Sequence, residues 1–226
     1  MNKRKYLFVF LALVFVCVSA QTPNDGQPPV LAEIQPVDAR FTDPSQPRFN
    51  FGISANIGSN YHHYTAGAVD GKTTTSFGFG LMSQVNFGMW AIRPEVHYDR
   101  IRGQHPNGLI ATNNITVPLS LVLQAVDHSM GFAIGSDLFI GGFYSHRFSG
   151  TQGGVSIIFE YDSDLRLVEF FNRDEFGITW GFGFRAGPVR LGYTNRTALS
   201  NFTQRQNYVG AHIRNRTNYF TMTFMF

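Results

Sequence analysis

The chain ends on a strict alternation of apolar and polar positions. In the segment 217–226 the apolar parity carries Phe220, Met222, Phe224 and Phe226. The other parity is mostly threonine. A two-residue period is that of a strand with two different faces, and about ten tilted residues are enough to cross a bilayer. The pattern therefore predicts a membrane-spanning strand that ends on an aromatic residue.

Seven further segments repeat this alternation. They lie at 49–58, 76–87, 90–99, 115–124, 132–141, 175–185 and 189–194. One parity of each is rich in aromatic and aliphatic side chains, and the other is rich in Gly, Ser, Thr and Asn with a few charges. Together with the terminal segment they make eight, and closing an antiparallel up-and-down sheet requires an even number of strands.

The connections between these segments alternate in length. Long ones are expected at 64–75, 100–114, 146–174 and 199–216, and short ones near 87–88, 127–130 and 186–188. Short turns on one side and long loops on the other are typical of outer-membrane barrels. The sequence thus predicts an all-β fold, an eight-stranded antiparallel up-and-down transmembrane β-barrel, with its long loops outside the cell.

A soluble barrel or sandwich with inward aromatics would show the same period. Two features favour the membrane. The non-aromatic parity holds residues small enough for a crowded interior, and residues 1–20 have the basic start, short apolar run and Val18-Ser19-Ala20 ending of a cleaved signal peptide. An uncleaved membrane anchor is the alternative for that segment. We therefore divide the chain into a signal peptide (1–20), a Pro-rich periplasmic tail (21–47) and the barrel (48–226).

Processing changes the composition argument. The full chain has 18 Lys and Arg against 15 Asp and Glu, and removing Lys3, Arg4 and Lys5 leaves 15 against 15. A neutral mature chain gives no reason to expect nucleic-acid binding. The only cysteine, Cys17, is lost with the signal, so disulfides and thiolate chemistry are not expected.

Two stretches carry a family resemblance. The first begins at Asp174-Glu175-Phe176-Gly177 and continues through Gly181-Phe182-Gly183-Phe184 to the tight turn and strand at 187–193. The second is the strand at 115–123, which carries Pro118. Both resemble the PorT-like outer-membrane β-barrel domain family. The resemblance covers about 48–226. It implies an integral outer-membrane protein, mostly of unassigned function, with some members serving protein secretion, and it brings no catalytic residues.

The terminal strand also resembles that of bacterial outer-membrane barrels in general. In that group the last strand and its aromatic end are recognised by the barrel-assembly machinery. The resemblance therefore implies that the apolar parity of 217–226 is a membrane-assembly signal. Outer-membrane lipids and this machinery are the expected partners.

The parity of the strands predicts a polar network in the lumen. Its expected members are Arg93, Glu95, His97, Asp99, Asp137, Glu175, Arg185 and Arg190, with Arg196 as a further candidate. Charges inside a narrow barrel must be paired, so we interpret the network as structural. A proton or ligand site centred on His97 between two carboxylates is the functional alternative. We expect no metal and no cofactor, since ligands from one strand do not converge.

Ser145-His146 is the one tempting nucleophile–base pair. Adjacent strand residues point to opposite faces, so the two cannot hydrogen-bond in a regular strand. We predict a non-enzymatic outer-membrane barrel, a structural, interaction or secretion-associated envelope component that acts through its extracellular loops or periplasmic tail. Another envelope protein is the expected partner of the 146–174 loop or the 21–47 tail. A lipid-modifying enzyme and a narrow solute channel stay open as alternatives, although eight strands leave room only for side chains.

Overall fold

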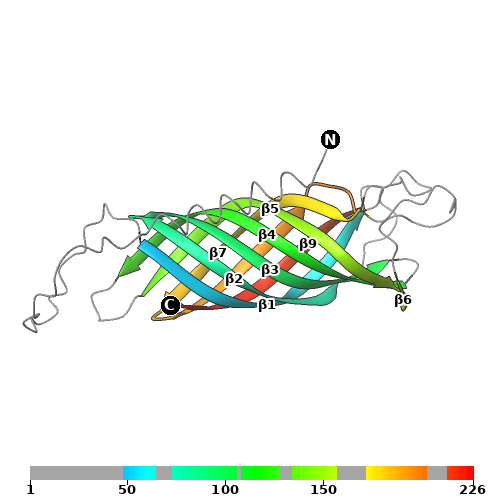
Figure 1. Ribbon diagram of the computed structural model, residues 1–226, viewed down its shortest axis with the longest axis horizontal. Helices are drawn as coiled ribbons and strands as arrows, with labels where there is room; N and C mark the ends of the chain where they lie inside the picture. The colour runs from blue at the N-terminus through cyan, green and yellow to red at the C-terminus, as the bar shows by residue number, and fades with distance from the viewer. Residues whose placement is uncertain (1–47, 65–72, 106–107, 128–133, 157–171, 203–212) are drawn as a thin grey trace, which may run out of the picture. The chain divides into compact units, whose positions relative to one another are not determined.

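The fold is known from a computed structural model that describes most of the predicted barrel (Figure 1). The described residues are 48–64, 73–105, 108–127, 134–156, 172–202 and 213–226. They form β1 (Arg48–Tyr64), β2 (Thr74–Phe87), β3 (Trp90–His105), β4 (Gly108–Asp127), β5 (Ile134–Gln152), β6 (Val155–Ser156), β7 (Asp174–Ala186), β8 (Val189–Ala198) and β9 (Ile213–Met225). The described residues include no helix that is long and apolar enough to cross a membrane. The predicted signal peptide and tail lie outside them.

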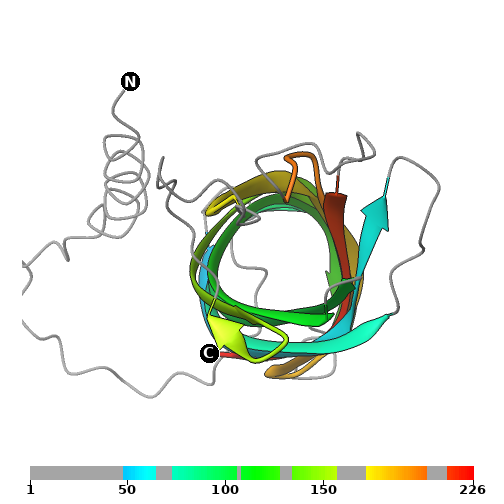
Figure 2. The ribbon, with the colours of Figure 1, turned by 90° about the vertical axis from the view of Figure 1, so that its right-hand side faces the viewer.

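The strands close into a ring. Neighbours pair in the order β4-β3-β2-β1-β9-β8-β7-β5, and β4 also pairs with β5, which completes the circle. Every one of these pairings is antiparallel. The short β6 pairs only with the end of β5. Figure 2 shows the ring end-on. The predicted eight-stranded antiparallel up-and-down barrel is confirmed.

The wall of the barrel is apolar outside and polar inside. On β2 the exposed positions include Phe79 (60%) and Leu81 (64%), and on β9 Phe220 is 70% exposed, whereas inward-facing Ser76 and Thr223 are at most 1% exposed. The aromatic-rich parity therefore faces outward, which contradicts the soluble alternative with its inward aromatics. Such an inverted distribution is that of a protein whose surrounding solvent is hydrocarbon.

Glycines on the inward parity make room for large neighbours. A Cβ placed on Gly80 would lie 2.5 Å from Nδ1 of His97, and one placed on Gly183 would lie 2.5 Å from Cζ of Arg190. At either distance the neighbouring side chain would have to move to admit a methyl group. The Gly-x-Gly pairs of β2 and β7 thus allow inward side chains to crowd together, as expected from the sequence.

Two of the predicted tight turns are observed in full. Gly88-Met89 joins β2 to β3, and Gly187-Pro188 joins β7 to β8. Each turn has its glycine at positive φ, 65° at Gly88 and 58° at Gly187, where a side chain would be strained. The predicted 127–130 turn falls largely on residues outside the described ranges, as does Phe132, the predicted start of the fifth strand.

The predicted boundaries of the long loops were less accurate. The 100–114 loop is wrong, because β3 runs to His105, β4 begins at Gly108, and only residues 106–107 separate them. β5 likewise continues past His146 to Gln152 and turns back through β6. β9 begins at Ile213, four residues before the predicted start. Beyond the apolar belt the backbone ladder continues without hydrophobic alternation, so the sequence pattern fades before the strands end.

Candidate functional site: the polar lumen

Among the described residues, eight charged side chains from four strands form ion pairs in the lumen. They are Arg93, Glu95 and Asp99 on β3, Asp137 and Arg147 on β5, Glu175 on β7, and Arg190 and Arg196 on β8. Four are cations and four are anions, and none has a side chain more than 14% exposed. Because unpaired charges at such depth are costly, the balanced set stabilises the interior only as a complete network.

One carboxylate gathers two arginines at the end of the lumen near the short turns. Arg190 binds Asp137 through two contacts, Nε to Oδ2 at 2.6 Å and Nη2 to Oδ1 at 2.5 Å. Arg93 reaches the same carboxylate at 3.4 Å and binds Glu95 Oε1 at 2.9 Å. The guanidinium of Arg93 also lies 4.2 Å from the ring centre of inward-facing Phe139. The cluster ties β3, β5 and β8 together.

His97 lies at the centre of this network and is fully engaged. Its Nε2 is 2.5 Å from Glu95 Oε2, and its Nδ1 is 3.1 Å from Nδ2 of Asn56 on β1. Since the Asn56 amide nitrogen donates to Nδ1, the ring proton belongs on Nε2 and points to Glu95. Asp99, the second carboxylate of the predicted His97 site, is instead paired with Arg196. The ring is 1% exposed, which limits its access to any solute.

An ion pair crosses the lumen from wall to wall. Arg196 Nη1 on β8 lies 2.6 Å from Asp99 Oδ2 on β3. In the ring of strands β3 and β8 are opposite, because three strands separate them in either direction. The pair therefore links opposite walls of the barrel, and we call the Asp99–Arg196 ion pair the strut. The ring of Tyr219 lies beside it, with its centre 5.2 Å from the Arg196 guanidinium carbon.

A second charged cluster lies nearer the long-loop end. Arg147 forms an ion pair with Glu175, which also accepts a hydrogen bond from Asn215 Nδ2 at 2.6 Å. Arg147 donates through Nη1 to the carbonyl of Asn172 at 2.6 Å, and its guanidinium lies 4.5 Å from the ring centre of Phe202. Arg147 was not among the predicted network members, because the predicted strand ended at 141 and the long loop was expected to begin at His146. Arg147 is an even number of residues from Asp137, so continuing the same alternation would have placed its side chain in the lumen.

Arg185 is placed differently from the other predicted network members. It lies at the end of β7, is partly exposed, and donates from Nε to the carbonyl of Gly187 at 2.9 Å. Its bond is thus to the tight turn and not to a carboxylate of the network. The other seven predicted residues lie in the lumen with the partners described above.

Ser145 and His146 lie on opposite faces of the wall. The Ser145 hydroxyl is buried, 3.0 Å from that of Thr116, while His146 faces outward with Nδ1 2.8 Å from Asp174 Oδ1. The same Asp174 oxygen accepts a bond from the Tyr144 hydroxyl at 2.6 Å. Ser145 and His146 therefore cannot act together as a nucleophile and its base. Within the described ranges, no three His, Cys, Asp or Glu side chains are grouped to hold a metal ion.

The apolar parity of the last strand faces outward. The exposed fractions are 70% for Phe220, 54% for Met222, 51% for Phe224 and 70% for Phe226. The backbone of Phe226 is held against β1, donating to the carbonyl of Phe51 at 2.8 Å and accepting from its amide at 3.1 Å. The role of this strand as an assembly signal stays a prediction.

Comparisons with known proteins give low similarities. No family model matches the chain, and no curated protein matches it. Neisserial surface protein A (NspA) has 10% sequence identity and a TM-score of 0.47, covering 78% of this chain and 97% of that chain. Ail, the attachment invasion locus protein of Yersinia pestis, solved with the heparin analogue sucrose octasulfate, has 11% identity and a TM-score of 0.38, covering 78% and 99%. The outer membrane protein OprG from Pseudomonas aeruginosa has 11% identity and a TM-score of 0.41, covering 81% and 98%.

Similarities at this level transfer neither a family nor a residue's role to this chain. The resemblance to PorT-like barrels therefore stays a prediction.

Proposed function

We propose that this chain is an integral outer-membrane β-barrel that works as a structural or interaction component of the envelope, and not as an enzyme or an open channel. The observation that carries the proposal is the pairing of an apolar outer wall with a lumen bridged by ion pairs. The charges inside are stable only when they are paired, and the aromatic rings outside are stable only when lipid covers them.

The apolar belt has the dimensions of a membrane. On β2 the outward-facing rings run from Phe77 to Phe87, and on β7 from Phe176 to Phe184. With a strand rise of about 3.3 Å and a tilt of about 40°, the β2 run covers roughly 25 Å of height, which is the belt of outer-membrane barrels. The belt supports a barrel that spans a bilayer and is not merely attached to one.

The lumen argues against free diffusion of solutes. The strut between Asp99 and Arg196 joins opposite walls, and the Asp137 cluster joins three strands closer to the short turns. A solute would have to break these pairs to pass. The narrow-channel alternative therefore requires the network to open, and the enzyme alternative requires a site other than Ser145-His146.

Interaction through the loops or the tail is the role that we retain. The described part of the 146–174 segment contributes outward-facing Phe148 and, in β6, Val155, which is 72% exposed. Large apolar side chains beyond the belt are a typical feature of protein-binding surfaces. The rest of that segment and the tail, residues 157–171 and 21–47, lie outside the described ranges. Another envelope protein is the partner that we propose.

Two measurements test the barrel. The membrane-extracted protein should migrate differently in gels with and without heating, and it should show no steady conductance in planar bilayers. A protein that stays in the aqueous fraction would contradict the barrel. A stable open conductance in the unmodified protein would contradict the closed lumen.

The interaction role has its own test. Chains lacking 157–171 or 21–47 would be compared with the full chain in pull-downs from crosslinked cells, with folding checked by gel mobility. We expect one deletion to remove a specific partner. If both deletions keep every partner, the interaction does not use these segments.

A further inference from the structure

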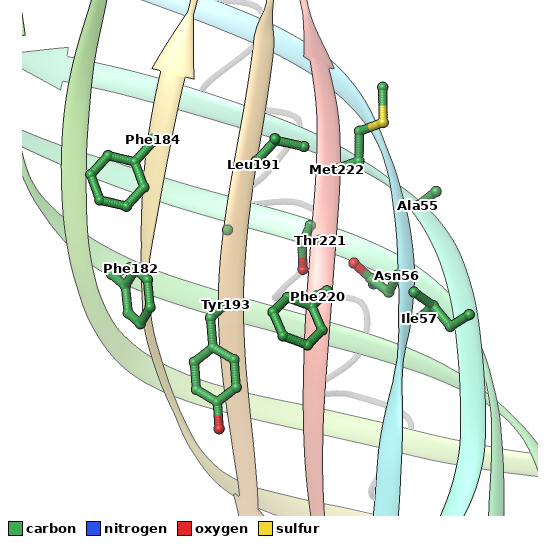
Figure 3. A pocket seen from close by; sticks show the side chains of 11 residues that line it. Ala55, Asn56, Ile57, Phe182, Phe184, Leu191, Tyr193, Phe220, Thr221 and Met222 are labelled. Atoms are coloured by element: carbon green, nitrogen blue, oxygen red, sulfur yellow. The ribbon is translucent and has the colours of Figure 1, made fainter.

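The outer wall carries an apolar groove over β7, β8, β9 and β1 (Figure 3). Its volume is about 670 Å³, within the roughly 300–1,000 Å³ of small-molecule sites. The lining is dominated by outward-facing Phe182, Phe184, Leu191, Tyr193, Phe220 and Met222, with small Ala55 on the β1 side. The Tyr193 ring contacts a ring on each neighbouring strand, with centroid separations of 5.7 Å to Phe182 and 6.1 Å to Phe220.

A polar ledge lies next to the groove, on the side away from the short turns. It consists of Tyr193, Asn195, Thr197 and Asn218, all on the outward parity of β8 or β9. The Tyr193 hydroxyl and Asn195 Nδ2 both donate to Asn218 Oδ1, at 2.8 and 2.6 Å, and Thr197 Oγ1 is 2.9 Å from Asn195 Oδ1. Because these groups satisfy one another, they can lie at the edge of a hydrocarbon region. The ledge marks the level where the belt ends.

Two arginines follow directly beyond the ledge. Arg214 and Arg216 are exposed on the same outward parity of β9, and Arg216 pairs in register with Thr197 of the ledge. Its guanidinium lies 5.9 Å from the ring centre of Tyr61 on β1. Neither arginine has an ion pair with a carboxylate among the described residues. Arg216 is four residues from Phe220, about 13 Å along the strand.

This order of groove, ledge and cations matches a lipid with an anionic headgroup. We propose that the face binds one phosphorylated, acylated glycolipid of the outer leaflet, with a phosphate on Arg214 and Arg216 and an acyl chain in the groove. Guanidinium groups bind phosphate through charge-assisted, bidentate hydrogen bonds, and the rings supply apolar contact below. The arginines lie toward the long-loop end, which the barrel wiring places outside the cell, so the outer-leaflet glycolipid is the occupant. The inference rests on the proposed outer-membrane location.

The test uses lipid A as the probe and the full mature barrel folded in zwitterionic detergent. Lipid A binding would be measured by titration with native mass spectrometry, alongside phosphatidylglycerol as an anionic lipid without the glycolipid backbone. The main variant is R214Q/R216Q, whose exposed positions should leave folding intact. Ala55→Trp fills the groove without changing charge. R100Q/R102Q is the matched control, because those arginines share the outward parity of β3 and lie two strands away from β1, on the far side from the groove.

We expect R214Q/R216Q to weaken lipid A binding about tenfold or more, as for loss of charge-assisted contacts. Ala55→Trp should also weaken it, and R100Q/R102Q should bind like the unmodified chain. Unchanged binding by R214Q/R216Q, or an equal loss in R100Q/R102Q, would overturn the site. Equally tight binding of phosphatidylglycerol would overturn the choice of glycolipid. Failure of the outer-membrane proposal would look different from failure of the lipid site. In that case the unmodified chain would lack heat-modifiable gel mobility before any lipid is added.

Discussion

Replacing Arg196 by methionine is the most direct test of the strut across the lumen. The substitution keeps an unbranched apolar stem beside Tyr219 and removes the charge together with the guanidinium hydrogen-bond donors. Asp99, which is 0% exposed, then stays behind as a buried anion without its arginine. We predict a large loss of stability from this single change, because the remaining charge cannot reach water.

The magnitude follows from the geometry of the pair. At a separation of 2.6 Å and an effective dielectric constant of about 20, the attraction is roughly 6 kcal/mol. Desolvation of the two ions costs several kcal/mol each, so the intact pair contributes little net stability. Removing one partner leaves that desolvation uncompensated and should cost about 3–5 kcal/mol. The double variant R196M/D99L removes both charges and should lie within about 1.5 kcal/mol of the unmodified chain.

The assay is urea unfolding of the barrel in phospholipid vesicles, followed by tryptophan fluorescence. Trp90 and Trp180 are the only two tryptophans, and both face outward, 46% and 42% exposed, so their emission reports contact with lipid. Gel mobility with and without heating confirms that each variant starts folded. The four chains of the cycle, including D99L alone, give the coupling energy of the pair.

Two results would refute the reasoning. One is an R196M variant within about 0.5 kcal/mol of the unmodified chain, as for an ordinary surface change. The other is an additive cycle, in which the double variant loses the sum of the single losses. Either would mean that Asp99 and Arg196 do not form a buried ion pair across the lumen.

Three further predictions concern the wall, the glycines and the terminal residue. Leu81→Arg, near the middle of the belt, should cost about 2–4 kcal/mol in vesicle unfolding, and a cost near zero would mean that this face does not meet hydrocarbon. Gly183→Val should cost about 1–3 kcal/mol by displacing the Arg190 guanidinium, and the same change should cost much less in an Arg190→Met background; equal costs would remove the steric explanation. Phe226→Ala should lower the amount of barrel in the outer membrane of cells while refolding into detergent is unchanged, and normal cellular levels would count against the assembly signal.

The sequence was sufficient for the faces of the strands and insufficient for their ends. The two-residue period shows which set of alternate residues is apolar. Hydrocarbon outside the wall then requires the apolar side chains to face outward. Beyond the belt the wall does not contact hydrocarbon, so apolar and polar residues need not alternate there. The continuation of β3 to His105 could therefore not be predicted from hydrophobicity. The register shift between Asn113 and Asn114 also breaks the period in that region. Arg147 was missed for the same reason.

The partners of the lumen charges were equally inaccessible. Local pattern places Asp99 and Arg190 on the inward parity, but it does not say which opposite residue each one meets. That choice depends on the stagger of the strands around the whole ring, which is a property of the closed barrel. The sequence listed Arg196 only as a further candidate, yet the structure gives it the bond across the lumen.

The equal number of cations and anions among the described ion pairs of the lumen has a consequence for how the barrel assembles. Asp99 and Arg196 are 97 positions apart in the chain, and Asp137 and Arg190 are 53 apart, so their neutralisation requires distant segments to arrive together. A half-formed sheet would expose isolated ions to lipid, at a cost that rises with every strand inserted alone. Partly assembled forms are thereby disfavoured, and we expect β3, β5 and β8 to enter the membrane together, since these strands carry the two long-range pairs.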